Sequence, residues 1–187
     1  MKGRKKTSAW VVLALSLVLA LAACGGQATG TPSVTERFEQ GNEYARQGDF
    51  EQAITEYEAV LEAEPDNVSA MTNLGVALYN VGRLDEAVAQ YQDALEIAPN
   101  DADIHSNLGA AYVQKGQLQD ALVEYEQAVD LQPDLAQAHF GLGVIYVELA
   151  RNDEAIAAFE RFLELDEGQD SMASDLAQQY LQQLRGQ

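Results

Sequence analysis

The chain has 187 residues, of which 30 are acidic and 11 are basic, so its formal charge at pH 7 is −19. A charge this negative argues against binding of nucleic acid, whose phosphates need cationic partners, and against docking of a folded body on anionic lipid. The single cysteine has no internal partner, which excludes a disulfide within the chain.

The first 23 residues have the composition of a secretion signal. Four basic side chains fall within residues 1–8, and residues 9–23 are apolar apart from Ser16. A membrane-spanning helix needs about 20 apolar residues, whereas the apolar core of a signal peptide needs only about 7–15. Residues 1–23 are therefore predicted to be a removable signal. Its loss changes the formal charge from −19 to −23, because four basic and no acidic side chains leave with it.

Cys24 follows this apolar stretch directly. An incidental buried thiol is one interpretation, since free cysteine behaves as a small hydrophobic residue. The preceding residues favour another, because Leu21-Ala22-Ala23-Cys24 resembles the lipobox of bacterial lipoproteins. The resemblance implies a diacylglyceryl group on Cys24, cleavage just before it, and acylation of the new N-terminus by a fatty acid such as palmitate. We therefore expect an extracytoplasmic protein that lipid anchors to a bacterial cell membrane or outer membrane.

A small, polar and glycine-rich stretch at residues 24–33 is predicted to be a flexible tether. Beyond it the chain repeats with a period of 34 residues and no insertions. The recurring positions carry a small, an aromatic or a proline residue: Gly41, Gly75, Gly109 and Gly143; Ala53, Ala87, Ala121 and Ala155; Tyr57, Tyr91, Tyr125 and Phe159; Pro65, Pro99 and Pro133.

This pattern resembles the tetratricopeptide repeat (TPR). The resemblance implies an all-α fold, a right-handed α-solenoid of four helix-turn-helix repeats followed by a capping helix. The repeats would span 34–67, 68–101, 102–135 and 136–169, and the capping helix 170–187. The signature tryptophan is absent from every repeat. The fourth repeat also lacks the turn glycine and the proline, which suits the end of an array.

The glycines and prolines place the helix ends within each repeat. First helices are expected near 34–47, 68–81, 102–115 and 136–149, and second helices near 50–63, 84–97, 118–131 and 152–165. In the capping helix, the apolar residues expected to cover the last open face are Met172, Leu176, Tyr180 and Leu184.

No catalytic motif is present. His105 and His139 are 34 residues apart at the same repeat position, and no further metal ligand stands at a recognised spacing, so packing is the preferred interpretation. Asp101 and Asp103 lack the glycine and the distal glutamate of a calcium loop, and helix capping is preferred for them. We expect no enzyme activity, metal, cofactor or small-molecule substrate.

The TPR resemblance implies a concave groove lined by the first helices. The residues at the lining positions are Phe38, Asn42, Arg46, Thr72, Val76, Tyr79, Asn80, Ser106, Ala110, Val113, Gln114, Phe140, Val144 and Val147. Several are apolar and could form a strip that another protein covers. The alternative is that some of them pack between helices, since apolar residues at helical spacing are usually core.

One TPR binding mode, a clamp for a C-terminal carboxylate, can be examined in the sequence. Asn42 and Asn73 match its asparagines, but Phe38, Asp103 and Asn107 stand where the family places basic residues. Without those cations little would neutralise a carboxylate, so this mode is not expected.

The function expected from the sequence is that of a membrane-anchored scaffold. It would bind a peptide or helix of a partner protein in the groove, as part of assembling an envelope complex. The partner is expected to offer an apolar segment with basic flanks. A regulatory subunit of a cell-wall or envelope enzyme is the alternative, and the sequence does not separate the two.

The anchor gives the first prediction. Cys24→Ser should abolish lipid attachment, because serine lacks the thiol that is modified. Metabolic labelling with a fatty-acid probe measures this, and label retained on the serine variant would refute the lipobox interpretation.

Overall fold

The computed structural model describes residues 32–186, so the predicted signal, Cys24 and most of the predicted tether lie outside the described residues. The described part consists of nine α-helices and no strands, which confirms the all-α fold. The helices are α1 (Val34–Gln47), α2 (Phe50–Ala63), α3 (Val68–Asn80), α4 (Leu84–Ile97), α5 (Ala102–Gln114), α6 (Leu118–Leu131), α7 (Ala136–Glu148), α8 (Asn152–Asp166) and α9 (Ser171–Arg185). None of these helices is long and apolar enough to cross a membrane.

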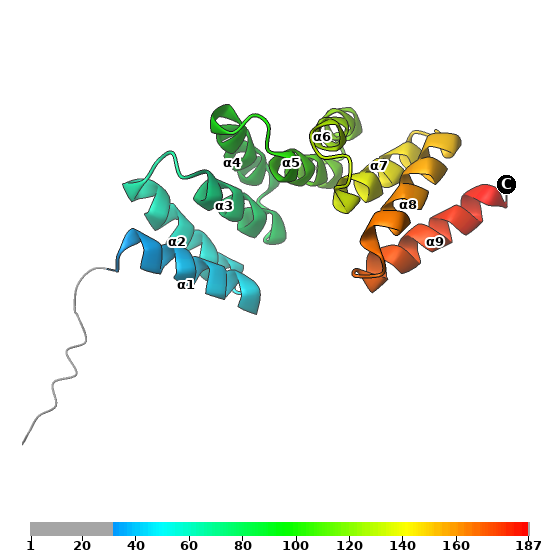
Figure 1. The fold of residues 1–187 in the computed structure, drawn as a ribbon. Coiled ribbons are helices and arrows are strands. Elements are labelled where there is room, and N and C mark those ends of the chain that lie inside the picture. Colours follow the sequence, from blue (N-terminus) through cyan, green and yellow to red (C-terminus); the bar gives the residue numbers. More distant parts are fainter. Residues whose placement is uncertain (1–31, 187) are drawn as a thin grey trace, which may run out of the picture. The chain divides into compact units, whose positions relative to one another are not determined.

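The helices pack as successive pairs, each on its neighbours in sequence (Figure 1). The pairs are α1–α2, α3–α4, α5–α6 and α7–α8, and α9 packs on α8. First helices of neighbouring pairs also touch, α1 with α3, α3 with α5 and α5 with α7. Each unit therefore contacts only the units beside it, as in an α-solenoid. Every helix of the four pairs begins and ends within one residue of its predicted bounds.

The short turns inside the pairs depend on residues in the left-handed region. Gly48, Gly82 and Gly116 have φ values of 82°, 78° and 72°, as predicted for glycines that end a helix. In the fourth pair Ala150 takes this place with φ 55°. A residue with a Cβ pays roughly 1–2 kcal/mol for that conformation, so the last turn is the most strained of the four.

The two helices of a pair meet where a glycine lies under an aromatic ring. A Cβ added to Gly75 would lie 2.5 Å from Cε1 of Tyr91, and one added to Gly143 would lie 2.7 Å from Cδ1 of Phe159. Tyr91 and Phe159 are almost completely buried. The ring fills the space that the missing side chain leaves, so the helices approach more closely than any larger residue would permit.

The connection from α8 to α9 departs from the repeat. The three earlier second helices stop before a proline, whereas α8 has Glu167 in that place and extends to Asp166. Glu167 and Gly168 then both adopt positive φ, at 50° and 81°. Asp166 is buried, and its carboxylate accepts hydrogen bonds from the backbone of Asp170 at 3.1 Å and from Ser174 Oγ at 2.9 Å. This turn sets the rotation of α9 about its own axis.

The prediction of the buried face of α9 is partly right. Of Met172, Leu176, Tyr180 and Leu184, Leu184 is buried and Tyr180 stacks on Phe159, but Met172 is 80% exposed and Leu176 is 40% exposed. The helix also buries Ser174, Ala177 and Leu181. A step of four residues advances about 40° around an α-helix, because one turn takes 3.6 residues. The predicted stripe therefore winds around the helix, and its first half turns away from α8.

The glycine contact gives a graded stability prediction. Gly75→Ala should lower the free energy of unfolding by about 1–3 kcal/mol through overpacking against Tyr91. At Gly109 an added Cβ would lie 3.0 Å from the Tyr125 ring, a milder contact. There the gain in helix propensity of about 1 kcal/mol should offset most of the cost. Thermal unfolding followed by circular dichroism measures both variants, and no greater loss at Gly75 than at Gly109 would contradict the packing account.

Candidate functional site

The predicted groove residues all lie on the first helices of the pairs, α1, α3, α5 and α7. Most are half-buried or exposed. Ser106 is the exception, because it is only 1% exposed and its hydroxyl has no hydrogen-bond partner among the described residues. Its prediction as a groove residue is therefore wrong. The helix turns this position into the contact between neighbouring helices, where a small side chain fits.

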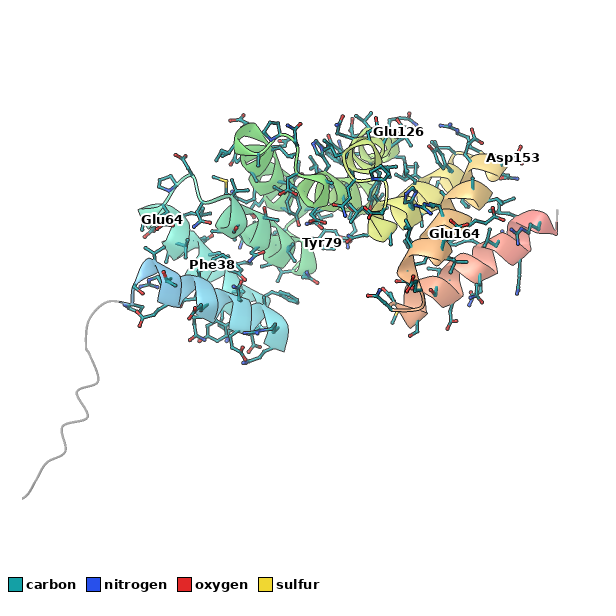
Figure 2. All side chains as sticks on the ribbon, in the orientation of Figure 1. Phe38, Glu64, Tyr79, Glu126, Asp153 and Glu164 are labelled. Atoms are coloured by element: carbon teal, nitrogen blue, oxygen red, sulfur yellow. The ribbon has the colours of Figure 1, made fainter. Side chains whose placement is uncertain are left out.

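Three pockets follow one another along this side of the helices, and this row of three pockets is called the groove. The first measures about 530 Å³, the second about 220 Å³ and the third about 430 Å³. The first two share Val76, and the second and third share Gln137. Of the predicted residues, the following line one or more of them: Asn42, Arg46, Val76, Tyr79, Asn80, Ala110 and Phe140. In Figure 2, Tyr79 lies on the lower side of the helices, whereas Glu126 and Asp153 lie on the upper side.

The other predicted residues do not line a pocket. Apart from Ser106 they are Phe38, Thr72, Val113, Gln114, Val144 and Val147. Phe38 packs on the first hydrophobic core, with its ring centroid 5.9 Å from that of Tyr57. Val113, Val144 and Val147 also pack on core clusters and stay half-buried. Part of each of these apolar side chains is therefore buried between helices, as the packing alternative proposed.

The first pocket has a hydrogen-bonded floor. Tyr57 Oη donates to Asn42 Oδ1 at 2.8 Å, and Asn73 Nδ2 donates to the same oxygen at 2.9 Å. This network joins α1, α2 and α3. Burial raises the pKa of Tyr57, so its phenol remains neutral at physiological pH. The floor is polar and uncharged.

The same network bears on the carboxylate clamp. Asn42 and Asn73 do lie together, but Asn42 Oδ1 is already occupied by two donors. The one cation of this pocket is Arg46, which pairs with Glu43 at 2.5 Å. A carboxylate would meet little free positive charge here, in agreement with the expectation from the sequence.

The second pocket is lined by neutral polar groups and small apolar ones. It is bounded by Val76, Tyr79, Asn80, Tyr91, Asn107, Ala110 and Gln137. Burial is the main cause that raises the pKa of Tyr91, and the same holds for Tyr125 nearby on α6. With both phenols neutral, the middle of the groove carries no charge. It can offer hydrogen bonds and apolar contact to a peptide.

The second-helix tyrosines of the groove floor were not predicted from the sequence. Tyr57 and Tyr91 were identified only as recurring aromatic residues of the repeat and not as groove residues, yet each lines a pocket. Gly41 and Gly75 allow this, because the rings lie directly against them and extend between neighbouring first helices. The recurrence of tyrosine rather than phenylalanine at this repeat position is the signal that could have found them.

The third pocket lies at the far end, where α7, α8 and α9 meet. Its lining is Ala136, Gln137, Phe140, Phe162, Asp166, Asp170 and Ala173. The ring centroid of Phe140 lies 5.1 Å from that of Phe162 and 5.8 Å from that of Phe159. An aromatic wall therefore stands beside two carboxylates. The contribution of α9 to this pocket was not predicted.

The body around the groove is strongly acidic. Residues 32–186 contain 7 basic and all 30 acidic side chains, a formal charge of −23. Every one of these basic residues pairs with a carboxylate: Arg37, Arg46, Arg83, Lys115, Arg151, Arg161 and Arg185. The surface of the described part thus presents many carboxylates and no uncompensated cation.

The histidines make local hydrogen bonds. His105 Nδ1 lies 2.6 Å from Glu124 Oε2, and its Nε2 lies 3.2 Å from the carbonyl oxygen of Pro99. His139 Nε2 lies 3.0 Å from the carbonyl oxygen of Pro133. Each ring therefore ties the loop before its helix to that helix. In the part of the chain with described positions, no three histidine, cysteine or acidic residues are grouped to hold a metal.

Models of the tetratricopeptide repeat match the chain in overlapping stretches. They cover residues 38–102, 90–123, 110–149 and 136–169. These matches show that the chain contains TPR repeats, as the resemblance implied. No curated protein sequence matches the chain.

Solved structures with the same fold include TPR proteins of several kinds. A MamA fragment from Desulfovibrio magneticus is 28% identical, covers 74% of this chain and 78% of its own, and has a TM-score of 0.62. A TPR protein from Parabacteroides merdae is 27% identical over 82% of this chain and 60% of its own, with a TM-score of 0.67. The first TPR domain of Spaghetti (RPAP3), bound to the HSP90 peptide SRMEEVD, is 27% identical over 63% of this chain and 93% of its own, with a TM-score of 0.61.

The hydrogen-bonded floor gives a prediction with a matched control. Tyr57→Phe should lower the free energy of unfolding by about 0.5–1.5 kcal/mol, because it removes the donor to Asn42. Tyr91→Phe, in the next pair, should have almost no effect, since the Tyr91 hydroxyl makes no hydrogen bond to a described residue. Chemical denaturation of both variants measures the difference. Equal stability of the two variants would contradict the network.

Proposed function

We propose that this chain, which is built from tetratricopeptide repeats, is a protein-binding scaffold held at a bacterial membrane by lipid on Cys24. It would hold a segment of another protein in the groove formed by the three pockets. The observation that carries the proposal is the composition of this groove. It is apolar and neutral-polar in its middle, within a body whose charge is −23.

The groove suits a peptide or helix better than a small molecule. Its three pockets follow one another along α1, α3, α5 and α7, so they offer a row of contacts in place of a single enclosed cavity. Val76, Tyr79 and Ala110 supply apolar contact, and Asn80 and Asn107 supply hydrogen-bonding groups. A helix or an extended segment of a partner would cover such a row.

The charge of the body favours a partner segment with basic flanks. The structural neighbour from Spaghetti (RPAP3) holds SRMEEVD, a peptide rich in acidic residues. The present groove has Arg46 as its one cation at the α1 end, and that side chain is paired. An acidic peptide would therefore be repelled, whereas lysine or arginine beside the apolar part would be attracted.

Membrane attachment would place this groove outside the cytoplasm. The order of basic, apolar and small residues before Cys24 supports export and lipid modification. Two or more acyl chains on one residue would hold the protein at a bilayer. We propose that the scaffold gathers components of an envelope assembly there.

The groove is tested by comparing two variants of the tagged full-length chain in affinity capture from detergent-solubilised cells. Tyr79→Ala/Asn80→Ala alters the second pocket, and Val123→Ala removes an exposed apolar side chain of α6 that lines none of the groove pockets. A protein captured by the wild type should be retained by Val123→Ala and lost with the groove variant, because one buried aromatic anchor often contributes about 2 kcal/mol or more.

Varying the salt concentration separates the electrostatic contribution to binding from the contribution of contacts in the groove. Raising it from about 0.05 to 0.5 M shortens the Debye length from roughly 14 to 4 Å, which should weaken capture of a basic partner by the wild type. Capture that is equally strong with the groove variant would contradict the proposed site.

A further inference from the structure

The third and seventh repeat positions carry residues of different polarity at the two ends of the helix array. In the three inner first helices, the third and seventh repeat positions are apolar and buried, for example Leu74 at 4% and Leu142 at 6% exposure. At the N-terminal end of the described residues, in α1, these positions are the exposed polar residues Glu36 and Gln40. Polar side chains are what an uncovered end needs.

At the C-terminal end the corresponding positions are Met172 and Leu176. They are 80% and 40% exposed, although they lie one helical turn apart on the same side of α9. The chain thus keeps two adjacent apolar side chains in solvent at one end and avoids this at the other. Adjacent exposed apolar side chains beside a pocket offer apolar contact to a partner.

One member of the exposed pair lies beside the third pocket. Ala173 of α9 lines that pocket together with Phe140, and Leu176 follows Ala173 by three residues, which makes the two neighbours on the helix surface. Gln178 and Gln182 of α9 line a different pocket with Leu163. Leu176 therefore lies next to the third pocket, and Met172 lies one turn before Leu176 on the exposed face of α9.

The two charged residues that line the third pocket are both acidic. Asp166 and Asp170 line the third pocket, and Asp175 lies between Met172 and Leu176 in sequence. None of these carboxylates takes part in an ion pair within residues 32–186, and the basic residues of that range are paired elsewhere. Phe140, which is half-buried, adds an aromatic ring to this pocket, and a cation is attracted to the face of such a ring. The first pocket, in contrast, carries both Glu39 and Arg46.

We propose that α9 forms the last wall of the groove and receives the basic end of the bound segment. Met172 and Leu176 would contact an apolar side chain of that segment, and Asp170 and Asp175 would attract a lysine or arginine next to it. This inference rests on the proposed function and deepens it, because it gives the bound segment a direction, with its basic end at α9.

A second copy of the chain fits this surface less well. Each copy carries a formal charge of −23 in its described part, and its α1 end presents Glu36, Gln40 and Glu43. Within residues 32–186, neither end supplies an unpaired cation for Asp170 or Asp175. Charge complementarity therefore favours a cationic partner over self-association.

The test uses the full-length chain in nanodiscs of neutral phosphatidylcholine and two fluorescent peptides, read by anisotropy. Both peptides alternate leucine with glutamine, and they end in two lysines or in two glutamates. Wild type should prefer the lysine peptide. Met172→Gln/Leu176→Gln should weaken that binding about tenfold or more, Asp175→Asn should weaken binding of the lysine peptide alone, and Val123→Gln should match wild type.

The outcomes separate this inference from the function on which it rests. If Tyr79→Ala/Asn80→Ala weakens binding and the Met172/Leu176 variant does not, the groove stands and the role of α9 is overturned. If neither variant changes binding, both proposals fail. Failure of wild type to prefer the lysine peptide also overturns the inference. Sedimentation velocity gives a further test. If wild type is a dimer and the Met172/Leu176 variant is a monomer, the inference is also overturned, because a second copy of the chain would then cover Met172 and Leu176.

Discussion

The close approach of the two helices in each pair, with a glycine under an aromatic ring, is the constraint on which the rest of the structure depends. A Cβ at Gly75 would lie 2.5 Å from Tyr91, so the helices could not meet as they do with any larger residue. The same rings, Tyr57 and Tyr91, also line the pockets along the first helices. Packing inside the pair thus shapes the groove floor, and the stability of the fold and the composition of the site have one origin.

The outer surface of the described part differs from the groove in its charge. Carboxylates cover the body, and each basic residue of the described part is paired with one of them. The groove middle is free of charge because every residue that lines it is neutral. In the proposed function, long-range attraction and short-range contact are therefore supplied by different parts of the molecule. The first would govern how fast a partner approaches, and the second would govern how long it stays.

Much of this fold could be predicted from the sequence, because the 34-residue period places glycines, alanines and aromatic residues at every helix contact. The prediction for α9 was right at Leu184 and wrong at Met172 and Leu176, because a step of four residues winds about 40° around the helix and carries the predicted stripe away from α8. The turn before α9 also departs from the repeat, since α8 lacks the proline, extends to Asp166 and is followed by positive φ at Glu167 and Gly168. Ser106 was predicted as a groove residue but is buried, because the repeat position alone does not show how far a side chain is buried between helices. Tyr57 and Tyr91 were missed as groove residues because a ring can pack with its face and line a pocket with its edge.

The central claim is that a partner lies along the first helices and not on the outer second helices. Site-specific photocrosslinking in living cells tests this most directly, with benzoylphenylalanine placed at Tyr79 in one chain and at Glu126 in another. Glu126 lies on the opposite side of the helices from Tyr79 in Figure 2. The account predicts an adduct of one defined mass from position 79 and none from position 126. Adducts from position 126 alone would place the partner on the acidic second-helix face and contradict the account.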